Sequence, residues 1–237
     1  MEKGIILMGG RATRLYPLSS ATNKHLLPVG NKPMIYYPIE KLTKAGIHDI
    51  LIITGVEHMG SVFSLLGSGK NFNCDFTYKV QDEAGGIAQA LALGEAFTNE
   101  KSCCVLLGDN IFQDSLADLI ENFSTGARVF LKEVTDPQRF GVAEIEGDKV
   151  ISIEEKPLQP RSNFAVTGVY CYDNKVFDFI KKLKPSKRGE LEITSVNNMY
   201  LEQNALSYSI LNGWWSDAGT FESLHSVNNL VNCSKVY

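Results

Sequence analysis

Residues 4–15 read GIILMGGRATRL, an apolar run that passes into a basic loop containing glycine. The branched residues up to Met8 are typical of a buried strand. Gly9 and Gly10 would let the backbone approach a phosphate closely, and Arg14 could add a bidentate charged donor. The same loop also fits an ordinary tight turn. The stretch therefore predicts an α/β fold, but it does not by itself establish phosphate binding.

The rest of the first half alternates between strand-like and helix-like segments. This alternation predicts a mostly parallel sheet that helices cover on both faces. Ligands of such sheets bind outside the carboxyl ends of the strands, so we look for chemistry just after Met8, Val80 and Leu107. The expected strands are 4–8, 49–54, 76–80 and 103–107, and the expected helices are 33–45, 58–66 and 86–97.

The second half contains more strands, separated by short turns such as 146–148. This pattern predicts strands added to the same sheet, together with a hairpin. No repeat, low-complexity segment or linker-like tract divides the chain, so we expect a single domain over residues 1–237. The expected strands are 128–134, 142–145, 150–154 and 166–172, and the expected helices are 190–203 and 220–231.

Composition excludes several classes of protein. With 237 residues and 44% hydrophobic content, the chain can bury one substantial core. A net charge of -4 leaves no general basic field for nucleic acid or an anionic membrane. The five cysteines lack CxxC spacing, so we expect buried thiols and a reducing compartment. The first apolar run is too short for a secretory signal, and we expect a cytoplasmic protein without membrane spans.

Several common catalytic motifs are absent from the sequence. No Gly-Lys-Ser/Thr completes a Walker loop, and no GxGxxG indicates the dinucleotide site of a dehydrogenase. The four histidines lack the spacing of metal ligands. No GxSxG motif or cysteine–histidine arrangement favours a protein nucleophile.

Polar residues follow two of the expected strands. Asp109 and Asn110 come soon after the strand 103–107, and Asp217 lies in the segment WWSDAGT. An aspartate after a strand is commonly a helix cap, but two carboxylates could hold one Mg²⁺ that completes its shell with water and phosphate oxygens. The amide of Gln81 could read the edge of a pyrimidine, or it could lie in a surface loop.

An ordered series of motifs resembles the sugar-nucleotide pyrophosphorylases, a family of nucleotidyltransferases. GG-x(2)-TRL-x-P is followed by NKHLLPVGNKPM, and the resemblance extends over essentially the whole chain. The further motifs are QDEAGGIAQAL (81–91), LLGDN (106–110), RFGVAEI (139–145), EEKP (154–157), VTGVYCYD (166–173), RGELEIT (188–194) and GWWSDAGT (213–220).

The resemblance implies a reaction and a fold. The reaction is Mg²⁺-dependent transfer of a thymidylyl group from dTTP to glucose 1-phosphate, which gives dTDP-glucose and pyrophosphate for deoxysugar (dTDP-rhamnose type) and surface polysaccharide synthesis. The implied fold is a Rossmann-like mixed, mostly parallel sheet flanked by helices. Its nucleotide-binding part is about 1–125, and a β-rich, sugar-phosphate-binding elaboration is about 126–237. The family is usually tetrameric, which implies a homo-oligomer.

Two alternatives stay open beside this reaction. One is a related sugar-1-phosphate nucleotidyltransferase that uses UTP, CTP or GTP. The other is a weakly active or non-catalytic homologue that only binds sugar nucleotides.

The resemblance also implies roles for individual residues. Asp109 and Asp217 would hold Mg²⁺, Arg14 and Lys24 would bind triphosphate oxygens, and Lys156 would orient the sugar phosphate; these five are the implied catalytic set. The implied nucleotide-binding residues are Gly9, Gly10, Thr13, Arg14, Lys24, Gln81, Gly86 and Asp109. The implied sugar-phosphate-binding residues are Asn110, Gly141, Glu155, Lys156, Val166 and Trp215.

The phosphate loop departs from the family pattern. That pattern usually has glycine where this chain has Ala12, and the variable position is Arg11. Alanine at a position that needs a positive φ is strained by roughly 1 kcal/mol. We therefore expect weakened triphosphate binding, unless the charge of Arg11 compensates.

Overall fold

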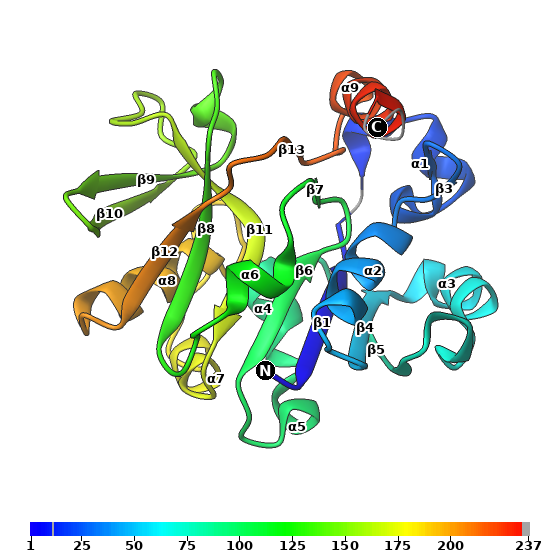
Figure 1. Ribbon diagram of the computed structural model, residues 1–237, viewed down its shortest axis with the longest axis horizontal. Coiled ribbons are helices and arrows are strands. Elements are labelled where there is room, and N and C mark those ends of the chain that lie inside the picture. The colour runs from blue at the N-terminus through cyan, green and yellow to red at the C-terminus, as the bar shows by residue number, and fades with distance from the viewer. Residues whose placement is uncertain (11, 234–237) are drawn as a thin grey trace.

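A computed structural model describes residues 1–10 and 12–233, and a nine-stranded mixed sheet forms the centre of this described chain (Figure 1). Its main path runs β10-β9-β11-β6-β1-β4-β5, while β8 lies beside β11 and β12 beside β8. The strands of this sheet are β1 (Lys3–Met8), β4 (Asp49–Gly55), β5 (Asp75–Gln81), β6 (Cys103–Leu107), β8 (Ala127–Glu133), β9 (Gly141–Glu146), β10 (Lys149–Glu155), β11 (Phe164–Tyr172) and β12 (Leu206–Ile210).

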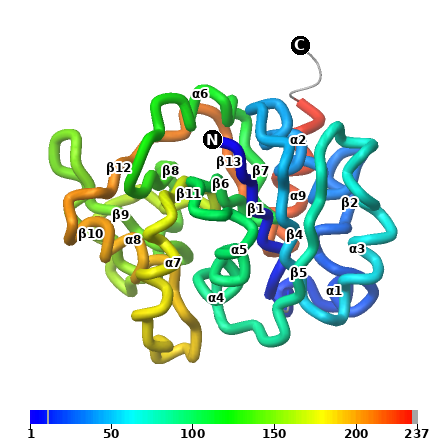
Figure 2. The backbone as a smooth tube through the Cα atoms, turned by 90° about the horizontal axis from the view of Figure 1, so that it is seen from below, coloured from blue at the N-terminus to red at the C-terminus, as the bar shows by residue number. Residues whose placement is uncertain are grey.

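Helices cover both faces of the sheet. Figure 2 shows α4 and α7 on one side and α2 and α6 on the other. The α-helices of the described chain are α1 (Leu18–Ala21), α2 (Tyr36–Lys44), α3 (Met59–Leu66), α4 (Ile87–Ala92), α5 (Glu95–Thr98), α6 (Leu116–Ile120), α7 (Lys175–Ile180), α8 (Ile193–Glu202) and α9 (Phe221–Cys233). The fold class predicted from the sequence is confirmed.

The parallel half of the sheet explains where a ligand can bind. β6, β1, β4 and β5 run parallel, so their carboxyl ends meet at one edge. Along β1 the side chains alternate between two cores: Ile5 packs with α4 and α7, and Ile6 packs with α2. Because both faces are covered, the strand is an uninterrupted apolar run.

The antiparallel half is joined to the parallel half through β11. This strand pairs antiparallel with β6, β8 and β9, and β9 forms a hairpin with β10. The pairing of β11 with β8 is irregular between Val166 and Tyr170. Within that stretch the Thr167 hydroxyl donates to the Phe130 carbonyl at 2.8 Å. The added strands and the hairpin agree with the sequence prediction.

Some predicted boundaries are wrong. The helix expected at 86–97 is split into α4 and α5 at Gly94, which packs so tightly that a Cβ there would lie 2.7 Å from Ile5 Cδ1. The helix expected from residue 190 begins at Ile193. The acidic side chains before this helix, Glu190 and Glu192, lie 3.1 Å and 3.5 Å from the Arg188 guanidinium.

The sequence did not indicate β12 and α7. The five cysteines, all within the described residues, are free, and four of them are buried as expected. Cys233 is exposed at the end of α9, which corrects the expectation for that residue. Among the described helices, none is both long and apolar enough to cross a membrane.

His25 fills the space beneath the loop that follows β6. Its side chain is buried, its backbone N–H donates to Asn23 Oδ1 at 2.9 Å, and its Nδ1 lies 2.7 Å from the same oxygen. Gly108 rests on the ring, because a Cβ at that position would lie 2.7 Å from His25 Cδ2. Burial lowers the pKa of His25 to about 3, so the imidazole is neutral in the folded protein near neutral pH.

Acid should therefore destabilise the fold through His25. Its pKa is about 3 in the folded protein against an ordinary value of 6.5, so between these values only the unfolded chain takes up the proton, and stability falls as the pH falls. Between pH 7 and pH 5, the free energy of unfolding should fall in wild type by about 1–2 kcal/mol more than it falls in His25→Gln. Urea denaturation at both pH values measures this difference.

His48→Gln is the matched control, since His48 is exposed. It should lose as much stability as wild type over the same pH range. An unchanged pH dependence in His25→Gln would contradict the buried neutral imidazole.

Candidate active site

Two segments far apart in the sequence meet beyond the carboxyl end of β6. β7 (Ile111–Phe112) pairs antiparallel with β13 (Trp215–Ser216), with Ile111 opposite Ser216. In an antiparallel pair, the residue before one strand lies beside the residue after the other. The pairing therefore brings Asp109 and Asn110 next to Asp217.

Asn110 holds this meeting point in place. Its Oδ1 accepts from the Gly168 N–H at 2.8 Å and from Trp215 Nε1 at 2.7 Å, and its Nδ2 donates to Asp109 Oδ1 at 3.0 Å. Gly168 lies in the irregular stretch of β11, where its N–H is directed to this side chain. A Cβ there would lie 2.5 Å from Asn110 Nδ2, so only glycine fits.

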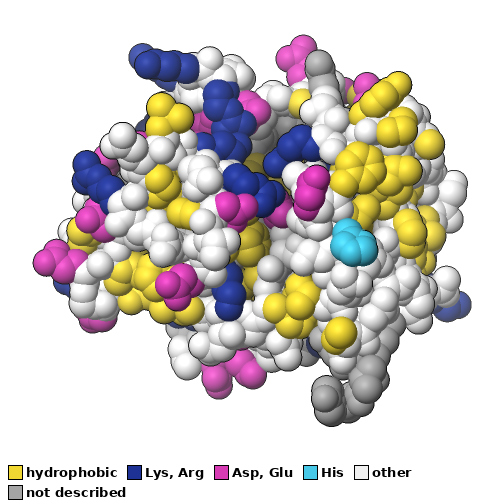
Figure 3. All heavy atoms as spheres, turned by 90° about the horizontal axis from the view of Figure 1, so that it is seen from above, with side chains coloured by type: hydrophobic (Ala, Val, Ile, Leu, Met, Phe, Trp, Pro, Cys, Tyr) yellow, Lys and Arg dark blue, Asp and Glu magenta, His cyan; other side chains and the backbone are white. Residues whose placement is uncertain are grey.

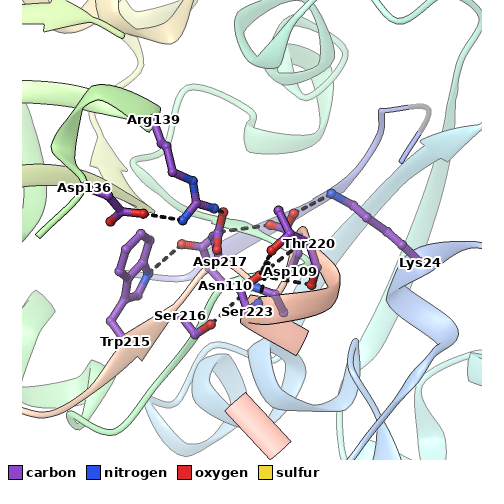
Figure 4. A network of polar contacts seen from close by, with 11 residues as sticks. Lys24, Asp109, Asn110, Asp136, Arg139, Trp215, Ser216, Asp217, Thr220 and Ser223 are labelled. Atoms are coloured by element: carbon purple, nitrogen blue, oxygen red, sulfur yellow. Dashed lines mark hydrogen bonds and ion pairs between the residues drawn. The ribbon is translucent and has the colours of Figure 1, made fainter. Parts of the chain in front are cut away.

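Each of the two carboxylates is paired with a cation. Lys24 forms an ion pair with Asp109, and Arg139 Nη2 lies 2.9 Å from Asp217 Oδ2. The two cations approach the carboxylates from opposite sides (Figure 4). Arg14 also comes close, because a Cβ on Gly219 would lie 3.3 Å from Arg14 Nη2 and 3.6 Å from Asp217 Oδ2.

Burial and charge act differently on the two carboxylates. Burial raises the pKa of Asp217; Arg139 opposes this rise and the neighbouring Asp109 charge adds to it. Burial alone would raise the pKa of Asp109, but the Lys24 charge and the hydrogen bonds from Lys24 and Asn110 hold it below its usual range. Because the two negative charges repel each other, a cation bound between Asp109 and Asp217 would stabilise both in their charged form.

The donor set fits Mg²⁺ bound together with phosphate. No group of three or more His, Cys, Asp or Glu side chains in the described part of the chain could hold a metal ion. A cation on Asp109 and Asp217 would therefore complete its shell with water and phosphate oxygens, as Mg²⁺ commonly does.

The loop that the resemblance assigns to phosphate follows β1 at the same edge of the sheet. Gly10 has φ 92°, and Ala12 has φ 48° and ψ 35°, the left-handed region expected for a position that favours glycine. Arg11 lies outside the described residues. Thr13 and Arg14 lie on the short 3₁₀ helix Thr13–Leu15 that closes the loop.

Gln81 lies against this loop at the end of β5. It is buried, and a Cβ on Gly9 would lie 2.6 Å from its Oε1. Its Nε2 donates to Gln89 Oε1 at 2.8 Å, and the same oxygen accepts from the Gly85 N–H at 2.9 Å. Gly86 has φ 104°. Gln81 thus lies against Gly9, and its Nε2 is 3.5 Å from the Gly86 carbonyl oxygen.

The residues assigned to the sugar phosphate gather on the other side. Gly141 lies opposite Val166 in the sheet and opposite Glu155 in the hairpin. Glu155 Oε2 accepts from the Thr194 hydroxyl at 2.6 Å. Lys156 has φ 47°, so the backbone turns away from the strand at this residue. Its Nζ lies 3.5 Å from Glu155 Oε1.

A cleft of about 400 Å³ opens beside Asp217. Figure 3 shows a hollow on one face of the molecule, with basic and acidic side chains gathered around it. The cleft is lined by Glu133, Val134, Thr135, Asp136, Arg139, Phe140, Trp215, Ser216, Asp217, Ser223, Ser226 and Leu230. Trp215 therefore lies at the cleft, whereas Trp214 packs against the core beneath α9.

The sequence interpretation overlooked several polar residues of this region. Arg139 holds Asp217, Arg188 lies 3.3 Å from Glu155, and Gln89 holds Gln81. Arg139 and Arg188 begin two of the motifs, RFGVAEI and RGELEIT. Nothing in their spacing along the chain indicates that they face carboxylates from other segments.

Comparisons with known proteins show the family of the chain. Residues 3–233 match the nucleotidyl transferase family. The chain is 50% identical over 236 residues to glucose-1-phosphate thymidylyltransferase of Neisseria meningitidis, covering 97% of this chain and 82% of the relative. It is 43% identical over 235 residues to the enzyme of the same name from Mycolicibacterium smegmatis, again covering 97% and 82%.

Solved structures are similar as well. A putative glucose-1-phosphate thymidylyltransferase from Bacillus anthracis, in complex with a sucrose, superposes with a TM-score of 0.93 at 57% identity and covers 97% of this chain and 95% of its own. UDP-glucose pyrophosphorylase complexed with UDP-glucose superposes with a TM-score of 0.89 at 24% identity over 99% of both chains, and shares the fold. From the match over nearly its whole length, the chain belongs to the nucleotidyl transferase family.

Proposed function

We propose that the protein transfers a thymidylyl group from dTTP to glucose 1-phosphate and releases dTDP-glucose and pyrophosphate. The observation that carries the proposal is the pair of carboxylates, Asp109 and Asp217, each faced by a cation at the carboxyl edge of the sheet. Relatives at 43% to 50% identity that are named for this reaction support the choice of substrates.

Electrostatic positioning is the main task in this reaction. A sugar-phosphate oxygen attacks the α-phosphorus of the triphosphate, and no protein nucleophile is needed. Asp109 and Asp217 would hold Mg²⁺, which supplies charge neutralisation to the triphosphate when it is bound. Asn110 orients Asp109 for this role through its hydrogen bond.

The proposed phosphate contacts come from both sides of the carboxylate pair. The backbone of Gly9 and Gly10, with Thr13 and Arg14, would hold the pyrophosphate portion of dTTP. Lys24 would neutralise oxygens near the α-phosphorus. The Lys156 ammonium, about half exposed at the end of β10, would orient the attacking phosphate.

Base and sugar would bind in separate parts of the site. Gln81 and Gly86 would face the thymine, with the Gln81 amide held by Gln89. The sugar would face Asn110, Gly141, Glu155, Val166 and Trp215. In this proposal one domain has a nucleotide part at about 1–125 and a sugar-phosphate part at about 126–237, and Asn110 of the first part reaches the second through its hydrogen bond with Gly168. We extend the proposal to dTDP-glucose supply for deoxysugar and polysaccharide synthesis, in a cytoplasmic homo-oligomer.

Pyrophosphate release tests the reaction directly. With glucose 1-phosphate and Mg²⁺, we expect turnover with dTTP well above that with UTP, CTP, GTP or ATP, and none after chelation. Faster release with another triphosphate would favour the related nucleotidyltransferase. Binding of dTTP without release from any triphosphate would favour a homologue that only binds.

The carboxylate pair should account for most of the turnover. Asp217→Asn removes one charge at the position of the expected metal, so we expect the rate to fall by about 10²- to 10³-fold, as for loss of one focused electrostatic contact. Asp148→Asn, in the exposed hairpin turn, removes the same charge elsewhere and should leave the rate at the wild-type value. Equal rates in the two variants would contradict the assignment.

Ala12 should limit binding of the triphosphate. Because its backbone is in the left-handed region, we expect Ala12→Gly to raise the free energy of unfolding by about 1 kcal/mol and to lower the Kd for dTTP in calorimetry. Ala45→Gly, at φ -85°, is the control and should lower stability instead. No gain in stability for Ala12→Gly would show that this backbone carries no strain.

A further inference from the structure

Arg139 is fixed between two acidic residues at the edge of the cleft. It ends the 3₁₀ helix Pro137–Arg139, which connects β8 to β9. Its Nη1 donates to Asp136 Oδ2 at 2.7 Å, and its Nη2 donates to Asp217 Oδ2 at 2.9 Å. The two ends of one guanidinium therefore hold two different carboxylates, as Figure 4 shows.

An aromatic contact keeps Arg139 in this position. The guanidinium carbon lies 5.0 Å from the centre of the Phe140 ring, and Phe140 packs edge-on against Trp215 at 5.2 Å between ring centres. Trp215 in turn donates to Asn110. Arg139 is thus linked to the same group of residues that orients the carboxylate pair.

The charges of the site balance before any ligand binds. The two carboxylates Asp109 and Asp217 are offset by Lys24 and Arg139. A divalent cation on both carboxylates would leave a net charge of about +2 if both side-chain cations stayed in place, which Coulomb repulsion at short range disfavours. The cation would also share the Asp217 carboxylate with Arg139, whose Nη2 already donates to Oδ2 of that group.

We propose that Arg139 is an internal counter-ion of Asp217 that competes with the divalent metal for this carboxylate. The inference rests on the proposed function, because it takes Asp109 and Asp217 as the metal ligands. When a metal binds, Arg139 leaves Asp217 but keeps its ion pair with Asp136. The guanidinium therefore stays at the edge of the cleft. The anionic triphosphate then supplies the negative charge that the metal requires, so Arg139 couples metal binding to the arrival of the nucleotide.

The competition involves Arg139 more than Lys24. The Arg139 side chain is 32% exposed and has a second carboxylate partner ready, whereas the Lys24 side chain is 14% exposed. A cation that stays paired with a neighbouring carboxylate loses less free energy than one that is left unpaired in an apolar environment. Arg139 therefore has a low-cost alternative position when the metal takes Asp217.

Direct Mn²⁺ binding tests the proposal without turnover. Free Mn²⁺ is measured by electron paramagnetic resonance in titrations of wild type, Arg139→Gln and Arg161→Gln, first without nucleotide and then with dTTP. Arg161 is the charge-matched control, since it is 73% exposed and faces Glu144. Without nucleotide, we expect Arg139→Gln to bind Mn²⁺ about fivefold more tightly than wild type, the scale of a partly exposed ion pair.

Two further results are expected. Adding dTTP should raise Mn²⁺ affinity less in Arg139→Gln than in wild type, because the competing cation is already gone. Arg161→Gln should match wild type in both titrations. Arg139→Lys keeps the charge but lacks the planar fork whose two ends hold Asp136 and Asp217. It should fall between wild type and Arg139→Gln, and it provides a second test if Arg139→Gln does not fold.

Unchanged or weaker Mn²⁺ binding in both Arg139 variants would overturn the inference, as would an equal gain in Arg161→Gln. Failure of the proposed function is seen separately, since it is measured as pyrophosphate release by wild type. A wild-type protein that releases pyrophosphate but shows no Arg139 effect on Mn²⁺ overturns the inference alone.

Discussion

Repulsion between Asp109 and Asp217 is the constraint on which the site depends. Two carboxylates that lie close together and largely out of water raise each other's electrostatic energy, and the structure offsets this cost with cations. Lys24 faces one carboxylate and Arg139 the other, while Arg14 lies nearby. The same arrangement suits the divalent cation and the polyanionic phosphates of the proposed reaction, although the whole chain has a net charge of -4. Local placement of charge thus matters more than the total.

Backbone pairing holds these charges at a defined separation. The short β7–β13 pair brings two distant segments together, and Asn110 connects that pair to β11 through the Gly168 N–H. The interrupted ladder of β11 is what leaves this N–H for a side chain. An irregularity that would weaken an ordinary sheet here serves the site. His25, packed beneath Gly108, supports the same loop from below.

Local patterns predicted much of the fold and part of the site. The strands and the surrounding helices follow from apolar periodicity, which depends on nearby residues. Boundaries failed where tertiary contacts decided them: Gly94 packs against Ile5, and Glu190 faces Arg188. Arg139 was missed because its partner Asp217 lies 78 positions away. No local sequence pattern indicates an ion pair between residues so far apart in the chain.

By itself the sequence determined the α/β class, the glycine-bearing loop after the first strand and the motifs that resemble nucleotidyltransferases. These depend on residue type and short spacing, since propensity and periodicity act over a few residues. Only the tertiary structure decided that Lys24 faces Asp109, that Arg139 is shared between Asp136 and Asp217, and that Asn110 meets Gly168. Charge interactions depend on distance in space, and the fold sets those distances.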